Sequence, residues 1–148
     1  MRAASLALAA MLVPVAAGTA ELTVRLEGVA PLGGTLRVGL FDGAEAFAAR
    51  GGGVVASRNL PAKGERAAVV FADLPPGRYA VTAHHDVDDD RELDRLFALV
   101  PKEGVALGTN PPLLRMPAFD DIAVAVEGAT EVMLELVYPL GVRTAAER

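Results

Sequence analysis

Apolar and polar residues alternate along most of this chain in short stretches, which are separated by glycine, proline and charged residues. A period of two places the apolar side chains on one face of a strand and the polar ones on the other. The pattern predicts about seven strands, over residues 22–26, 36–41, 54–60, 65–71, 78–85, 122–126 and 131–138. Short alternating strands with frequent turns and almost no helix predict an all-β fold, an antiparallel β-sandwich.

Residues between the strands predict how the strands connect. The segment 31–34 is short enough to join the first two strands as a hairpin. Asp42 and Glu45 have the spacing of a capping box, and the alanines that follow favour one or two helical turns. The segment 73–77 is a strong turn signal, because its prolines fix φ and its glycine accepts a positive φ.

A long segment without clear periodicity, residues 95–119, follows the strand at 78–85. A loop of this length inside a compact domain is usually functional, or is ordered by another part of the structure. Within it, residues 102–104 (Lys-Glu-Gly) are expected to form either a recognition tip or a turn with solvated charges. Aromatic and aliphatic side chains in and around the segment are expected to pack in the core or beneath it: Tyr79, Phe97, Leu99 and Phe119.

The N-terminus has the composition of a secretory signal peptide. Arg2 supplies a short basic region, residues 6–17 are apolar, and small residues lead to Ala20, after which we expect cleavage. The apolar run is shorter than the ~20 residues of a transmembrane helix. We therefore expect a periplasmic or secreted protein with a single domain over residues 21–140 and a C-terminal tail over residues 141–148.

Charge and composition narrow the classes of partner. The formal net charge is −5, and removal of the residues up to Ala20, whose only charged side chain is Arg2, makes it −6. This mild acidity disfavours nucleic acid and anionic membrane as partners. The chain has no cysteine. Its stability must therefore come from the sheet core and from any metal ion it binds, because it can form no disulfide.

The most distinctive chemistry begins where the strand at 78–85 ends. Six acidic residues fall between positions 86 and 94, and several of them are spaced two residues apart. Alternating carboxylates in a tight loop suit Ca²⁺, which takes about six to eight oxygen ligands. We predict a calcium site in which Glu92 contributes its carbonyl and the other ligands their carboxylates: Asp86, Asp88, Asp90, Glu92 and Asp94.

This loop differs from an EF-hand. An EF-hand loop has glycine at its sixth position and glutamate at its twelfth, where this chain has Arg91 and Phe97. A strand rather than a helix also leads into the loop. A further acidic ligand could come from Glu103 or Asp120. The alternative is a solvated acidic loop, although clustered carboxylates without a cation raise one another's pKa at a cost in energy.

Two adjacent histidines precede the loop. His84 and His85 point to opposite faces of a strand, so they do not readily hold one metal ion. We expect His85 to pack at the strand end with a ring nitrogen hydrogen-bonded to the backbone of the acidic loop. An alternative function is a metal-dependent periplasmic enzyme that uses His85 and the acidic loop around a catalytic ion. A serine hydrolase is disfavoured, because Ser57 is the only serine after residue 20.

Two phrases in the chain resemble known families. The segment 71–81 is similar to the strand–turn–strand sequence motif of transthyretin-like modules. The region 74–126 resembles a family of exported bacterial proteins classified as a domain of unknown function, with the pattern His-Asp-x-Asn-x-Asn-Gly-x-Leu-Asp, then Pro-Lys-Glu-Gly, then Pro-x-Phe-x-Asp-Ala. The matching residues are His85, Asp86, Asp88, Asp90, Leu93, Asp94, Pro101, Lys102, Glu103, Gly104, Pro117, Phe119 and Asp121. Asp88 and Asp90 stand where the family has asparagine, and Arg91 where it has glycine.

The resemblance implies an exported, Ig-like or prealbumin-like sandwich and supplies no activity. We therefore expect a non-enzymatic binding or accessory module whose ligand is a protein, a peptide or a carbohydrate, without insertion into the membrane. The chain has few aromatic residues, which weakens a stacking platform for sugars.

Overall fold

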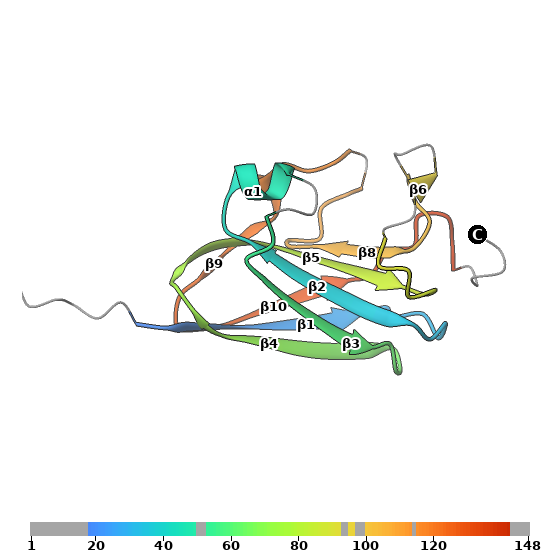
Figure 1. The fold of residues 1–148 in the computed structure, drawn as a ribbon, viewed down its shortest axis with the longest axis horizontal. Coiled ribbons are helices and arrows are strands. Elements are labelled where there is room, and N and C mark those ends of the chain that lie inside the picture. The colour runs from blue at the N-terminus through green and yellow to red at the C-terminus, as the bar shows by residue number, and fades with distance from the viewer. Residues whose placement is uncertain (1–17, 50–52, 93–94, 97–99, 114, 143–148) are drawn as a thin grey trace, which may run out of the picture.

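The structure is a computed structural model that describes residues 18–49, 53–92, 95–96, 100–113 and 115–142. Its strands and two short helices lie in the order β1 (Ala20–Glu27), β2 (Thr35–Phe41), α1 (Ala44–Ala48), β3 (Ala56–Pro61), β4 (Arg66–Leu74), β5 (Gly77–Asp86), β6 (Arg95–Leu96), β7 (Val100–Pro101), β8 (Gly104–Leu107), α2 (Phe119–Ile122), β9 (Ala123–Val126) and β10 (Ala129–Glu135). Two sheets face each other, so the expected all-β sandwich is confirmed (Figure 1).

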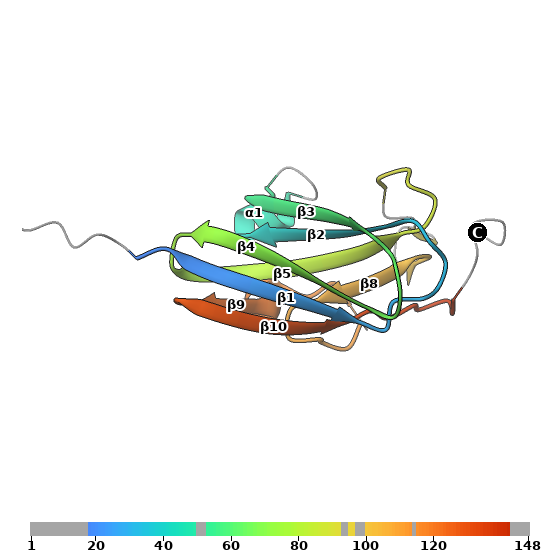
Figure 2. The same cartoon turned by 90° about the horizontal axis from the view of Figure 1, so that it is seen from below.

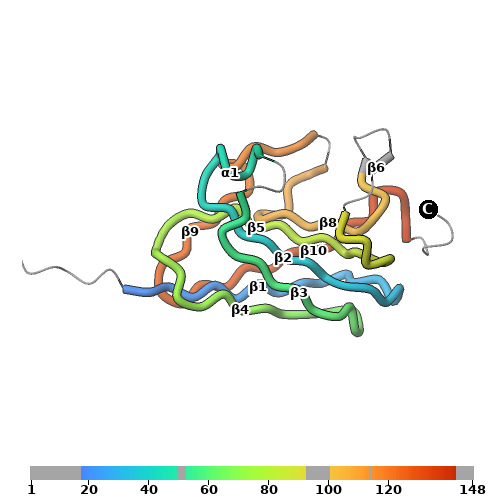
Figure 3. The backbone as a smooth tube through the Cα atoms, in the orientation of Figure 1, coloured from blue at the N-terminus to red at the C-terminus, as the bar shows by residue number. Residues whose placement is uncertain are grey.

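The first sheet has the strand order β10–β1–β4. Its backbone is traced in Figure 3, where β1 lies between β4 and β10. Alternation along β1 buries Leu22, Val24 and Leu26 against the opposite sheet. β1 pairs antiparallel with β4 but parallel with β10. The expectation of a purely antiparallel sandwich is therefore wrong for this pair, because alternation predicts which face of a strand is buried and not the direction of its neighbour.

The second sheet has the order β3–β2–β5–β8, and β9 pairs with β5 beside β8. Figure 2 shows the two layers from the side of the first sheet. Leu36, Val38 and Leu40 of β2 and Val81 and Ala83 of β5 face the first sheet and complete the core. The opposite face of β2 and β5 points away from the first sheet, and it carries the polar residues that concern the site.

The hairpin expected between the first two strands is not formed. β1 and β2 belong to different sheets, so the connection between them crosses the sandwich. Contacts with distant residues hold this connection: the Ala30 N–H donates to the Tyr138 hydroxyl over 2.9 Å, and the Val29 N–H donates to the Glu65 carbonyl over 3.1 Å. A Gly/Pro-rich linker predicts a reversal of direction, but the packing of the whole sheet determines the partner strand.

Two short helices cover one end of the outer face of the second sheet (Figure 1). Phe47 of α1 packs with Phe119 and Ile122 of α2 in a small second core. The predicted helical turn is confirmed, but its capping box is not, because Gly43 is the N-cap and no side chain bonds there. Ile122, expected in a strand, ends α2. None of the described helices is long and apolar enough to span a membrane.

The long segment after β5 contains more regular structure than its sequence predicts. β6 and β7 pair as a two-stranded ribbon, and β8 adds to the second sheet by pairing with residues 82–85 of β5. Tyr79 and Phe119 are buried as expected. Leu93, Asp94, Phe97 and Leu99, together with most of the N-terminal signal and of the C-terminal tail, lie outside the described residues.

Candidate functional site

The site lies where β5 leaves the second sheet and enters the acidic loop. His84 and Asp86 are two residues apart, so their side chains share the face of β5 that points away from the first sheet. Arg37 of β2 lies opposite His84 in the sheet. On the other side of β5, Gly104 at the start of β8 lies opposite His85 and brings Glu103 to the same place. Four charged or titratable side chains therefore meet at one sheet end.

Asp86 is the centre of this arrangement, and its side chain is fully buried. Its Oδ2 accepts hydrogen bonds from Arg37 Nε over 2.6 Å and from the Arg91 backbone N–H over 3.0 Å. Burial raises the pKa of this carboxyl, but the bonds from Arg37 and Arg91 and the charges of Arg37 and His84 lower it, so the net pKa lies below its ordinary value. Asp86 Oδ1 is buried and has no hydrogen-bond partner among the described residues.

Glu103 is also buried, with only 1% of its surface exposed. Its Oε1 accepts a hydrogen bond from the Val87 N–H over 3.0 Å, and its Oε2 lies 3.5 Å from His84 Nε2. Residues 102 and 103 form a bend between β7 and β8, but Glu103 is buried rather than solvated, because the pairing of β8 with β5 draws it inside. The carboxylate instead ties the start of the acidic loop to β8.

Two groups of side chains have the geometry to hold a metal ion, and they share Asp86. In each group the candidate ligand atoms lie within 4.8 Å of one another. The first group consists of His84, Asp86 and Glu103, and the second of Asp86, Asp88 and Asp90. Glu103, one of the two additional ligands expected from the sequence, lies with Asp86 in the first group. Asp120, the other candidate, instead pairs with Arg78 over 2.5 Å.

The acidic loop is held partly by its own carboxylates. Asp90 Oδ1 accepts a hydrogen bond from the Glu92 N–H over 2.7 Å, and Asp88 Oδ1 accepts one from the Asp90 N–H over 3.4 Å. Asp88, Asp90 and Glu92 are exposed. Among the predicted ligands, Asp86, Asp88 and Asp90 converge, the Glu92 side chain belongs to neither group, and Asp94 lies outside the described residues.

His84 is the ligand candidate that the sequence reasoning missed. As a pair, His84 and His85 are split between the two faces of β5, as the sequence predicts. The informative signal was the spacing from His84 to Asp86, which places both side chains on one face. His84 Nε2 is buried and has no hydrogen-bond partner among the described residues.

His85 is buried at the strand end as expected, but its backbone partner is Gly33 in the connection between β1 and β2 rather than the acidic loop. Its Nε2 lies 2.6 Å from the Gly33 carbonyl and its Nδ1 lies 2.7 Å from the Tyr138 hydroxyl. Because a carbonyl only accepts, Nε2 carries a hydrogen, and in the neutral ring Nδ1 accepts the hydroxyl hydrogen. The same hydroxyl accepts the Ala30 N–H. Both ring nitrogens of His85 are therefore engaged in the core.

Substitution Tyr138→Phe should cost about 1–3 kcal/mol of unfolding free energy, because it removes the hydroxyl to which the Ala30 N–H and His85 Nδ1 are hydrogen-bonded. Urea denaturation followed by circular dichroism measures this loss. Tyr79→Phe is the matched control, since it removes a single bond, from its hydroxyl to the nearby Pro75 carbonyl. Equal losses for the two variants would show that Tyr138 does not join the two segments energetically.

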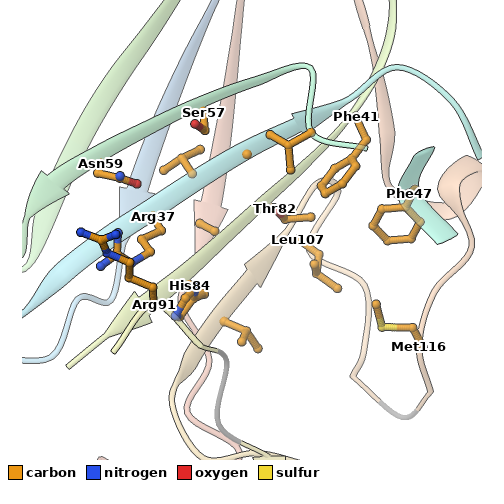
Figure 4. A pocket seen from close by; sticks show the side chains of 15 residues that line it. Arg37, Phe41, Phe47, Ser57, Asn59, Thr82, His84, Arg91, Leu107 and Met116 are labelled. Carbon is orange, nitrogen blue, oxygen red and sulfur yellow. The ribbon is translucent and has the colours of Figure 1, made fainter. Parts of the chain in front are cut away.

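A groove of about 530 Å³ runs over the outer face of the second sheet beside this site. Figure 4 shows Arg37, His84 and Arg91 at one end of it, and Phe41, Phe47, Leu107 and Met116 at the other. Ser57 of β3 also lines it. The site thus combines a potential cation centre, buried at the end of β5, with an open groove of mixed polarity.

Comparison with known proteins identifies a family. The family model described as "Uncharacterized protein conserved in bacteria (DUF2141)" matches residues 24–133, which include β2 to β9 and the whole candidate site. No curated protein and no solved structure matches the chain.

Proposed function

The chain belongs to the DUF2141 family of bacterial proteins, and from this premise we propose that it is an exported, non-catalytic β-sandwich binding module whose acidic loop binds calcium. One observation carries the proposal: the fully buried carboxylate of Asp86 has an oxygen, Oδ1, without a hydrogen-bond partner in the described part of the chain. A buried acceptor of this kind is costly unless a partner compensates it. A bound cation would supply that partner.

Calcium suits the loop side of Asp86. Asp88 and Asp90 bring carboxylates to within 4.8 Å of it, and the proposed set adds the Glu92 carbonyl and, from the sequence, Asp94. Hard oxygen ligands match the coordination of Ca²⁺, and water can complete a shell of about six to eight. Mg²⁺ fits less well, because it demands stricter octahedral geometry and keeps more of its own water.

A transition metal is the second candidate, at the other group of side chains that includes Asp86. His84 Nε2 is a buried nitrogen without a hydrogen-bond partner among the described residues, and it lies 3.5 Å from Glu103 Oε2. One histidine and two carboxylates are a ligand set that Zn²⁺ accepts. The choice between the two ions is therefore a choice between two ligand sets that share Asp86, and substitution of His84 separates them.

Calcium should raise the thermal stability of the whole chain. A ligand that binds only the native state at 100 times its Kd adds about 2.7 kcal/mol. Melting curves recorded with EGTA and with Ca²⁺ test this. The shift should disappear in Asp90→Asn and persist in Asp89→Asn, a control in the same loop whose φ of 59° suits asparagine. Superimposed curves for the unmodified chain would reject the calcium site.

The metal identity has its own test. His84→Gln should leave the Ca²⁺ shift unchanged, because the calcium set does not include this nitrogen. If instead Zn²⁺ shifts the melting curve, Ca²⁺ does not, and His84→Gln abolishes the Zn²⁺ shift, the ion is held by His84, Asp86 and Glu103. That outcome would replace calcium in the proposal while keeping Asp86 as its centre.

The absence of catalysis and the export are also parts of the proposal. Support for a non-catalytic role comes from His85, whose two ring nitrogens are engaged with Gly33 and Tyr138, so the alternative enzyme lacks its base. Support for export comes from the apolar N-terminal segment before Ala20. Expression of the full chain in a Gram-negative host, followed by fractionation and N-terminal sequencing, should recover a periplasmic protein that begins at Glu21.

A further inference from the structure

The groove over the second sheet has the size of a small-molecule site. Its volume of about 530 Å³ lies within the range of about 300–1,000 Å³ that such sites occupy. β2 and β5 form its floor through Gly39 and Thr82, which lie opposite each other. Because Gly39 has no side chain, the floor is low at its centre. α1 and the segment before α2 border one end of the groove, through Phe47 and Met116.

One end of the groove is cationic. Arg37 and Arg91 both line it, and Figure 4 draws their guanidinium groups at the same end, next to His84. Arg37 pairs with Asp86 over 2.6 Å and more loosely with the exposed Asp89 over 3.7 Å. Among the described residues, no carboxylate pairs with the Arg91 guanidinium. An anion in the groove would therefore meet one guanidinium without a competing partner and a second one close by.

The backbone of Arg91 adds an independent observation. Its φ is +70°, a left-handed conformation that costs an L-residue about 1–2 kcal/mol and glycine almost nothing. The Asp86 carboxylate holds this conformation by accepting the Arg91 N–H. Strained backbone of this kind clusters at functional sites. A glycine at this position would adopt the same φ without strain. The arginine side chain is therefore present at a cost in folding free energy.

The other end of the groove is apolar and open to solvent. Met116 and Val54 expose 54% and 42% of their surfaces, and both line the groove with Phe47 and Leu107. Apolar side chains gathered around a concave surface mark a ligand site more often than scattered ones do. A ligand that covered Met116 and Val54 would remove this apolar surface from water.

We propose that the groove binds a medium-chain alkyl carboxylate, with its carboxylate on Arg91 and Arg37 and its alkyl chain over Gly39 toward Leu107 and Met116. The proposal rests on the binding role proposed above and names the chemical class of the ligand. The separation of charge and apolar surface selects this class, because a sugar offers no alkyl chain and a metal ion does not use the apolar end. A carboxylate also matches the planar donors of arginine.

Calorimetric titration of the full chain with hexanoate, octanoate and decanoate tests this, in buffer with EGTA so that calcium soaps do not form. Affinity should rise about two- to fourfold for each added methylene, the upper value corresponding to the ~0.8 kcal/mol of a fully buried methylene. Octanol should bind at least tenfold more weakly than octanoate, because it lacks the charge that the arginines recognise. Equal affinities for the acid and the alcohol would overturn the proposal.

Two variants locate the ligand. Arg91→Gly should weaken decanoate binding at least tenfold while leaving the melting temperature unchanged or higher, since glycine relieves the left-handed φ. Gly39→Val should block the groove, because its side chain would project from the floor. The backbone should tolerate this change, since a Cβ at Gly39 would lie 3.5 Å from Thr82 and 3.6 Å from Val54, which is ordinary contact. Arg66→Gln, on the other sheet, is the control. Unchanged decanoate affinity in both groove variants would place the ligand elsewhere and reject the proposal.

The remaining outcomes separate this proposal from the calcium site. Alkyl carboxylates that fail to bind while the Ca²⁺ shift persists would reject the groove ligand alone. Decanoate binding without a Ca²⁺ shift would support the groove ligand and reject the calcium site. If a peptide with an apolar C-terminal residue binds and no alkyl carboxylate does, the groove is a peptide site and the proposed class is wrong.

Discussion

Asp86→Ala should destabilise the chain by about 3–5 kcal/mol, the cost of removing one partner from a buried charge pair. The Asp86 side chain is fully buried, and that of Arg37 is only 20% exposed. Without the carboxylate, the guanidinium and the Arg91 N–H both lose their acceptor. Urea denaturation of the full chain in EGTA measures this loss apart from any contribution of a metal ion.

Two comparisons make the result interpretable. Asp120→Ala removes the partner of Arg78, an aspartate–arginine pair in which both side chains are largely exposed, and it should change stability little. The double variant Arg37→Ala with Asp86→Ala should cost less than the sum of the two single changes, because it leaves no unpaired buried charge. Strict additivity would contradict the assignment of the loss to the Asp86–Arg37 pair.

The alternation of apolar residues was enough to predict the faces of the strands. Leu22, Val24 and Leu26 are buried, and His85 lies on the core side of β5 as its parity requires. The partners of these strands were not predictable in the same way. The pattern of β1 is equally satisfied beside β2 or between β4 and β10, and the choice depends on packing across the whole sandwich.

The candidate site was predictable where its residues are close in sequence. The spacing of Asp86, Asp88 and Asp90 indicated convergent carboxylates, and the structure brings them together. Glu103 was recognised only as one possible extra ligand, because a Lys-Glu-Gly segment resembles an exposed turn until β8 is known to pair with β5. The groove was not foreseen, since it is formed by β2, β3, β5, β8 and the segments around both helices.

The connection between β1 and β2 also supports the acidic loop, because Gly34 lies against the backbone of Asp86 and Val87. A single methyl group added at Gly34 should therefore have a large effect. Gly34 has a φ of +76°, and a Cβ added there would lie 2.7 Å from Val87 Cα and against the Asp86 carbonyl. Gly34→Ala should therefore cost about 3 kcal/mol or more, which combines the left-handed φ with overpacking against backbone that cannot easily move. Denaturation in EGTA measures the loss.

The neighbouring glycine supplies the matched control. Gly33 has nearly the same φ, +71°, but a Cβ there would meet nothing within 4 Å, so Gly33→Ala should cost only about 1–2 kcal/mol. The difference between the two variants isolates the contact between Gly34 and the root of the loop. Because that contact positions the Asp86 and Val87 backbone, Gly34→Ala should also weaken Ca²⁺ binding at least tenfold, whereas Gly33→Ala should not. If Gly34→Ala and Gly33→Ala had the same effect on stability and the same effect on calcium affinity, the acidic loop would be positioned by its own hydrogen bonds and by Glu103, without support from the connection between β1 and β2.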